Sequence, residues 1–96
     1  MIEILETDEY QHWFEGLRDL NAQFRIGARL RRVSLGNLGD VRSVGEGVFE
    51  FRIEHGPGYR VYFTRRGEAV IILLAGGDKS SQQRDIERAK ELARAL

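Results

Sequence analysis

The sequence predicts an α+β fold: an antiparallel sheet of about four strands, a two-helix hairpin on one face of that sheet, and a C-terminal helix. Two observations carry this prediction. Residues 48–75 contain three runs of β-branched and aromatic residues separated by Gly- or Pro-containing turns, which is the pattern of consecutive strands. Residues 10–33 instead repeat apolar residues at helical spacing. The expected order of elements is β, α, α, β, β, β, α.

The N-terminal part is expected to supply one edge strand and both helices of the hairpin. Residues 2–5 form the short apolar strand, and Thr7 is a suitable N-cap for the first helix. Asn21 can cap the second helix, and Gly36 stands where a left-handed C-terminal residue is expected. The apolar stripe of the first helix comprises Tyr10, Trp13, Phe14, Leu17 and Leu20, and that of the second comprises Ala22, Ile26, Leu30 and Val33.

The β-hairpin that follows turns at a Gly-Pro-Gly sequence and alternates between an apolar and a polar face. Its core face comprises Phe49, Phe51, Ile53, Val61 and Phe63. The other face carries Arg52, Arg60 and Tyr62. Either plausible register places the two arginines directly opposite each other or one diagonal step apart. Two interpretations are open: Glu50 and Glu54 neutralise the arginines, or the arginines bind an anionic ligand.

The last strand is expected over residues 69–75, whose apolar residues on both faces indicate a central strand covered at least partly on both sides. Residues 41–47, before the hairpin, are expected to be a loop or a frayed strand. A Gly-Gly-Asp-Lys loop should end the last strand, and Ser80 with Gln83 reads as a capping box for the final helix. If the last strand lies beside the hairpin, Lys79 comes near the arginine patch at the open face of the sheet and forms a shallow phosphate-binding cleft.

The composition of the chain excludes several kinds of site and location. The chain has 96 residues and no cysteine, so we expect one domain, residues 1–96, without disulfides or thiolate metal ligands. No apolar run approaches the roughly 20 residues needed to cross a bilayer, and the N-terminus lacks the pattern of a signal peptide. We therefore expect no membrane contact and a cytoplasmic location. His12 and His55 lack further ligands at metal spacing, and no P-loop or dinucleotide motif is present, so neither a metal nor a cofactor is expected.

The charge distribution is uneven although 15 basic and 15 acidic residues cancel. Residues 1–23 hold six acids and one arginine, a net charge of −5, whereas residues 24–66 hold nine arginines and four acids, a net charge of +5. In the second helix Arg25, Arg29 and Arg32 recur along one side and are expected to form a basic exposed face. Three interpretations are open: this face is solvated and pairs with acids of the first helix, contacts phosphates, or docks an acidic partner.

Two long segments of the chain are GNLGDVRSVGEGVFEFRIEHGPGYRVYF and LLAGGDKSSQQRDIERA. They resemble the phage Gp49-like, HigB-type branch of the RelE/ParE toxin superfamily, the toxins of bacterial type II toxin–antitoxin modules. The resemblance extends to a W-F-x-x-L sequence in the first helix and an R-I-x-x-R-L sequence in the second, and so covers nearly the whole chain. It implies the RelE-like fold, an antiparallel sheet with two helices on one face and a terminal helix.

The resemblance also implies a ribosome-dependent mRNA endoribonuclease, or mRNA interferase, that inhibits translation. Such enzymes cut mRNA in the ribosomal A site by metal-independent attack of a ribose 2′-OH on the adjacent phosphodiester, which leaves a 2′,3′-cyclic phosphate. Arg60 matches the strand arginine on the scissile phosphate, Arg52 matches a basic residue on the facing strand, and Lys79 stands where relatives carry a catalytic His or Tyr. The expected RNA- or ribosome-binding residues are Arg25, Arg29, Arg32 and Arg65.

The chain departs from the family pattern in its proton-transfer groups. It lacks the strand lysines of RelE and the histidine pair of HigB, and arginine has too high a pKa to act as an ordinary base. The remaining candidates are Lys79, Asp78, Tyr62 and His55. The alternative function is that of ParE-type toxins, which share the fold, lack the nuclease residues and inhibit DNA gyrase through protein contacts.

The partners implied by the resemblance are a helix-turn-helix antitoxin of the HigA type, the ribosome and mRNA. Operator DNA is expected to be contacted only through the toxin–antitoxin complex. No membrane partner is expected.

Overall fold

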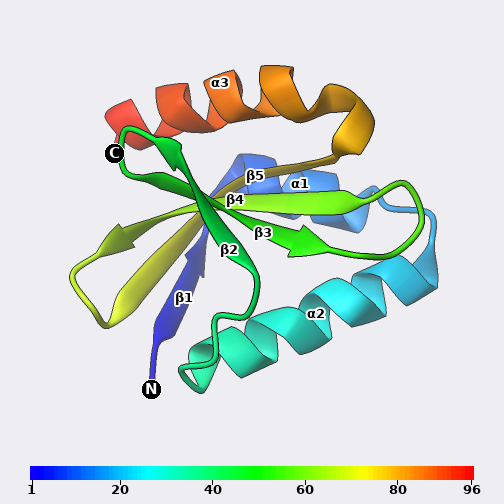
Figure 1. Cartoon of the computed structure of the whole chain (residues 1–96), viewed down its shortest axis with the longest axis horizontal. Coiled ribbons are helices and arrows are strands. Elements are labelled where there is room, and N and C mark those ends of the chain that lie inside the picture. The colour runs from blue at the N-terminus through cyan, green and yellow to red at the C-terminus, as the bar shows by residue number, and fades with distance from the viewer.

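The computed structural model describes all 96 residues, and Figure 1 shows their arrangement. The elements in order are β1 (Glu3–Glu6), α1 (Asp8–Glu15), α2 (Leu20–Ser34), β2 (Val41–Gly45), β3 (Val48–Ile53), β4 (Tyr59–Arg66), β5 (Val70–Asp78), a 3-10 turn η1 (Lys79–Ser81) and α3 (Gln82–Arg94). The five strands form one sheet in the order β1-β5-β4-β3-β2. β1 runs parallel to β5, and the other pairs are antiparallel.

The predicted α+β class is confirmed, but an antiparallel sheet of about four strands is wrong in both count and direction. The additional strand is β2, which lies in the region expected to be a loop or a frayed strand. It pairs with β3 through a tight turn in which Gly45, Glu46 and Gly47 all have positive φ. The parallel strand is β1, whose direction relative to β5 is not restricted by a short turn because α1 and α2 follow it.

Helices cover both faces of the sheet, as Figure 1 shows: α1 and α2 lie on one side and α3 on the other. The larger core, under α1 and α2, is built around Tyr10, Ala22, Ile26, Val33, Phe51, Val61, Phe63, Ile71 and Leu73. The smaller core, under α3, comprises Val48, Tyr62, Ile72, Leu74 and Ala89. The expectation of an internal strand covered on both faces is therefore confirmed for β5, which lies between β1 and β4. The expectation of an open polar face on the hairpin is wrong, because α3 packs its apolar side there.

The end of α1 and the start of α2 differ from the predicted ones. α1 ends at Glu15, and Leu20 is the exposed first residue of α2 rather than part of the first apolar stripe. Asp19, not Asn21, caps α2: its Oδ1 accepts the backbone N–H groups of Asn21 and Ala22 at 2.9 and 3.2 Å. Asp and Asn are equally good N-caps, and Asp19 comes first. The left-handed Gly36 after α2 is confirmed by its φ of 100°.

The Gly-Gly-Asp sequence is part of β5 rather than a loop that ends it. A Cβ atom added to Gly76 would overlap the ring of Trp13 on the α1 side, and one added to Gly77 would overlap the Asp85 carboxylate on the α3 side. The two glycines are thus positions of close packing on opposite faces of the strand. The predicted capping box is also absent, since Asp78 Oδ1 accepts the N–H of Ser80 at 2.8 Å and begins η1.

Candidate functional site

The two arginines of the hairpin lie directly opposite each other, with Arg52 on β3 paired to Arg60 on β4. This is one of the two registers that the sequence allowed. Their side chains lie on the α3 face, as does the side chain of Glu50 two residues before Arg52 on β3. Two cations at this spacing repel each other unless a negative group lies between them.

Glu50 supplies that negative group. Its carboxylate is 1% exposed, with Oε2 2.9 Å from Arg52 Nε and Oε1 3.7 Å from Arg60 Nε. Oε1 also accepts a hydrogen bond from Gln82 Nε2 at 2.8 Å, a contact for which the sequence carries no signal. A buried carboxylate is tolerated only when it is paired in this way. The neutralising interpretation is therefore correct for Glu50, and the hydrogen bond to it raises the pKa of Arg52.

Arg60 and Lys79 meet at the end of the sheet, beside Gly58. Arg60 is 8% exposed, and its Nη1 donates to the Gly58 carbonyl at 3.2 Å while its Nε has no hydrogen-bond partner. A Cβ atom added to Gly58 would lie 3.4 Å from Arg60 Nη1 and 3.5 Å from Lys79 Cβ. Lys79 itself is exposed. The structure therefore brings together Arg52, Arg60 and Lys79 where β3 ends, β4 begins and β5 ends.

The remaining catalytic candidates are placed very differently. Asp78 lies next to Lys79, and hydrogen bonds from Ser80 together with the charge of Arg60 lower the pKa of its carboxyl group. Tyr62 is fully buried under α3 with no partner for its hydroxyl group, and burial raises its pKa. Asp78 is half-buried at the end of β5, whereas Tyr62 is a core residue.

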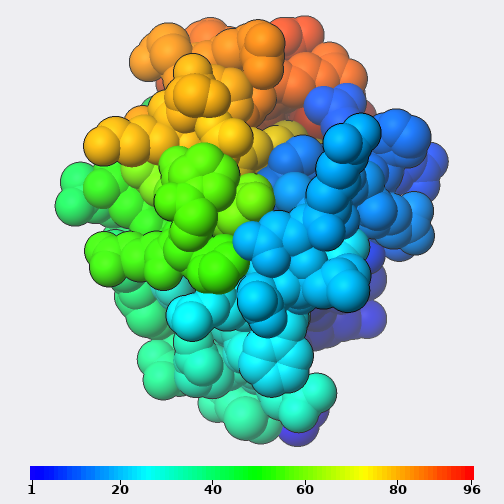
Figure 2. Space-filling view, turned by 90° about the vertical axis from the view of Figure 1, so that its right-hand side faces the viewer, coloured from blue at the N-terminus to red at the C-terminus, as the bar shows by residue number.

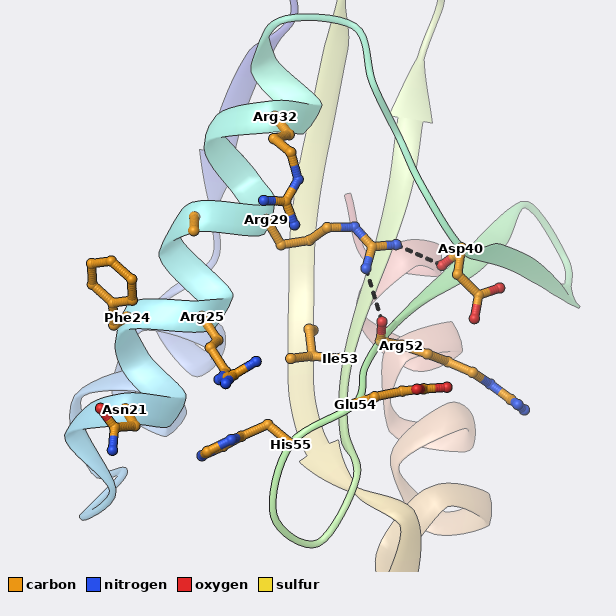
Figure 3. A pocket seen from close by; sticks show the side chains of 11 residues that line it. Asn21, Phe24, Arg25, Arg29, Arg32, Asp40, Arg52, Ile53, Glu54 and His55 are labelled. Carbon is orange, nitrogen blue, oxygen red and sulfur yellow. Dashed lines mark hydrogen bonds between the residues drawn. The ribbon is translucent and has the colours of Figure 1, made fainter.

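A groove of about 730 Å³ lies on the other face at the same end of the sheet, between α2 and the β3–β4 turn. In Figure 3 Arg25 and His55 point into this space from opposite sides, and Arg32 points toward it from the next turns of α2. Arg52 turns its backbone carbonyl toward the groove and its side chain away from it. Figure 2 shows this end of the molecule, with the β3–β4 turn in green between the start of α3 in orange and α2 in cyan.

The expected exposure of Arg29 is wrong. Arg29 is buried, and its guanidinium group donates to three backbone carbonyls, those of Leu38 (3.1 Å), Asp40 (2.7 Å) and Arg52 (2.9 Å). It also lies over the ring of Phe51, and burial lowers its pKa. The sequence did carry a signal for this. Arg29 is three residues after Ile26 and four before Val33, which places it on the buried side of the helix.

The exposed arginines of α2 do not pair with the acids of α1. No acidic side chain lies within 4.0 Å of Arg25, Arg31 or Arg32, and Glu9 of α1 instead binds Arg88 of α3 at 2.7 Å. The interpretation that the basic face is balanced by the first helix is therefore wrong. These three charges stay available to a ligand or a partner.

The side chains of Arg65 and His55 do not belong to the group formed by Arg52, Arg60 and Lys79. Arg65 is five residues beyond Arg60 on β4, roughly 17 Å along the strand, and donates to the Glu68 carbonyl. His55 Nε2 lies 2.9 Å from Asp19 Oδ2, and this hydrogen bond lowers the pKa of the Asp19 carboxyl group. No local pattern in the chain indicates this pair, which joins the β3–β4 turn to the start of α2.

The structure contains no cluster of three or more His, Asp or Glu side chains arranged to hold a metal ion. None of its helices has the length and apolar character needed to cross a membrane.

Comparison with known proteins gives two matches. The family described as phage-derived protein Gp49-like matches residues 12–96. A protein of Haemophilus influenzae, described only as uncharacterized, is 46% identical over 95 residues, which is 99% of this chain and 96% of that protein. No solved structure gives a significant match.

Proposed function

We propose that this chain, which belongs to the phage-derived Gp49-like family of RelE/HigB-type toxin-like proteins, is the toxin of a type II toxin–antitoxin module and cleaves mRNA on the ribosome. One observation carries the nuclease part of the proposal: the convergence of Arg52, Arg60 and Lys79 at one end of the sheet, beside the ionised Asp78. A phosphodiester in a negatively charged transition state requires cations held close together, and Lys79 is the exposed member of this group.

In the proposed reaction the 2′-oxygen of a ribose attacks the adjacent phosphorus, and the bond from phosphorus to the 5′-oxygen breaks. The 2′-hydroxyl proton leaves to a base, and the departing 5′-oxygen receives a proton, so the products are a 2′,3′-cyclic phosphate and a 5′-hydroxyl group. Arg60 and Lys79 offset the charge that builds on the phosphoryl oxygens. Asp78 is the accessible carboxylate for the 2′-hydroxyl proton, and the Lys79 ammonium group is the donor to the leaving oxygen.

The groove on the α2 face extends the proposed RNA site around the β3–β4 turn. Arg25 and Arg32 lie free of acidic partners there, so they can contact phosphates of the ribosome or of the message. Reversing both charges should weaken ribosome association, with the difference from the wild type shrinking as salt is added. Ribosome association that is the same in both proteins at every salt concentration would contradict this part of the proposal.

Primer extension on a reporter mRNA, taken from cells briefly induced for this protein with and without a translation block, tests the nuclease. We expect cuts inside the reading frame that disappear when ribosomes are kept off the message. Arg60→Ala should lower the cutting rate on the order of 100-fold because it removes a charge aimed at the phosphate. Arg66→Ala is the matched control, since Arg66 is exposed at the far end of the same strand.

Circular dichroism of the purified variants separates loss of chemistry from loss of fold. Should Arg60→Ala unfold, Lys79→Ala replaces it, because Lys79 is exposed and its side chain supports no core contact. Full cutting by either folded variant would refute the role of that residue.

The ion pairs of Glu50 with Arg52 and Arg60 favour a second candidate function. Because Glu50 already offsets the charges of Arg52 and Arg60 and Tyr62 is buried, catalysis would depend on Asp78 and Lys79 alone for proton transfer. A toxin of the ParE type, which inhibits DNA gyrase through protein contacts, needs none of them. Growth arrest with intact mRNA and altered plasmid supercoiling would support this second candidate over the nuclease.

A further inference from the structure

Helix α2 carries a second apolar stripe that faces solvent. Leu20, Phe24 and Leu35, the residue after the helix, are 75%, 76% and 66% exposed. At about 100° per residue these three positions fall within about 60° of one another around the helix axis. They lie opposite the buried stripe that packs on the sheet, and Figure 3 shows the Phe24 ring on the outer side of α2. Three large exposed apolar residues on one face of one helix indicate a contact surface.

A glycine in the middle of this stripe points to close approach by another element. Gly27 is exposed within α2, and a Cβ atom added there would meet nothing within 4 Å. Glycine weakens a helix interior relative to alanine, and nothing in the chain itself requires it at this position. The missing side chain leaves a hollow of about 400 Å³ between Phe24 and Arg31. Small residues at such places let the backbone of a second helix come close.

The charges beside the stripe define the chemistry of the occupant. Arg31 lies within the stripe, at an angle between Leu20 and Phe24, and Arg25 and Arg32 flank it on one side. None of the three has an acidic partner, and α2 contains no acidic residue from Leu20 to Ser34. A second copy of the same surface would bring like charges together, which disfavours a symmetric dimer. RNA phosphates would satisfy the arginines but leave Leu20 and Leu35 exposed. A protein helix with apolar residues flanked by carboxylates satisfies both.

We infer that the outer face of α2, from Leu20 to Leu35, docks an acidic amphipathic helix of a partner protein. The identification of that partner as the antitoxin rests on the proposed function. Phe24 and Arg32 line both this surface and the larger groove, so a docked helix lies over one wall of the groove. Docking therefore blocks the part of the RNA site that Arg25 and Arg32 form.

The probe is a synthetic amphipathic peptide of about 15 residues, the length of a stable helix of about four turns, with leucines on one face and glutamates beside them. A matched peptide carries lysine in place of each glutamate. Fluorescence anisotropy with the purified chain measures both affinities, and hydrogen exchange locates the contact. We expect the acidic peptide to bind more tightly, with protection confined to α2 and with an affinity that falls as salt is added.

Three variants test the surface itself. Gly27→Leu fills the hollow without weakening the helix, so it should lower peptide affinity by about tenfold. Phe24→Ser removes an apolar contact and should lower the affinity by a similar factor. Arg31→Glu should lower it and Arg84→Glu should not, because Arg84 is also exposed but lies on α3, on the opposite side of the sheet. Unchanged affinity in a folded Gly27→Leu protein, or equal binding of the two peptides, would overturn the inference.

A second copy of the chain or an RNA strand bound to the outer face of α2 would give different experimental results. A dimer in sedimentation that Gly27→Leu abolishes would assign the face to a second copy and overturn the inference, as would single-stranded RNA that binds there in place of the peptide. Peptide binding does not require catalysis. A chain that binds the acidic peptide through α2 but leaves mRNA intact would refute the nuclease and still support the docking surface.

Discussion

The arginines on the two faces of the sheet lie in opposite electrostatic situations. On the α3 face Arg52 and Arg60 share one buried carboxylate, that of Glu50, and lie in fixed positions. On the α2 face Arg25 and Arg32 project from a helix surface with no acidic partner. The difference follows from burial, because Glu50 and Arg60 are removed from water and require partners within the chain, whereas the exposed Arg25 and Arg32 do not. Fixed cations suit the positioning of a phosphate, and free cations suit attraction of a charged ligand.

The largest loss of stability is expected from substitution of the buried carboxylate, that of Glu50. Glu50→Gln keeps the shape of the side chain but leaves two arginines directly opposite each other without compensation, so the free energy of unfolding should fall by about 3 kcal/mol. Urea unfolding measures this loss. Glu54→Gln is the control, since Glu54 is an exposed carboxylate on the same strand end and should change stability by less than about 0.5 kcal/mol. Equal effects of the two substitutions would remove the contrast between the two faces.

Arg29 is the exception on the α2 side, because it behaves as a buried arginine within a basic helix. Arg29→Lys keeps the charge but replaces a planar group that bonds three carbonyls, so it should lower the free energy of unfolding by about 2 kcal/mol. Arg25→Lys on the same helix should be close to neutral. The comparison would fail if both substitutions proved neutral in the same thermal and urea unfolding experiments.

The smallest effect on stability is expected from Asp19 and His55, the pair that joins the start of α2 to the β3–β4 turn. The His55 hydrogen bond lowers the pKa of the folded Asp19 carboxyl group below its unfolded value. The stabilisation is therefore present above the unfolded value, near pH 4, and is lost as the pH falls through the folded value. The melting temperature of wild type relative to Asp19→Asn should fall between about pH 5 and pH 2. Glu15→Gln, at an exposed residue without an ion pair, should show no such change.

Local sequence patterns predicted much of the fold and part of the site. Alternation predicted β3 and β4 with their core residues, the apolar run predicted that β5 is an internal strand, and helical spacing identified the buried stripe of α2. The register of the hairpin put Arg52 opposite Arg60 as one of two allowed arrangements. These features depend on neighbours within a few residues, or on the two-residue period of a strand, and a sequence displays both directly.

Only the tertiary structure decided what depends on contacts between distant segments. The parallel pairing of β1 with β5, the cover of α3 over the polar hairpin face, and the Glu50–Gln82 contact each join residues far apart in the chain. The same is true of the burial of Arg29, since its partners are carbonyls of a loop and a strand that carry no side-chain signal. A sequence lists the groups that need partners, and the packing of the sheet and helices determines which partner each one meets.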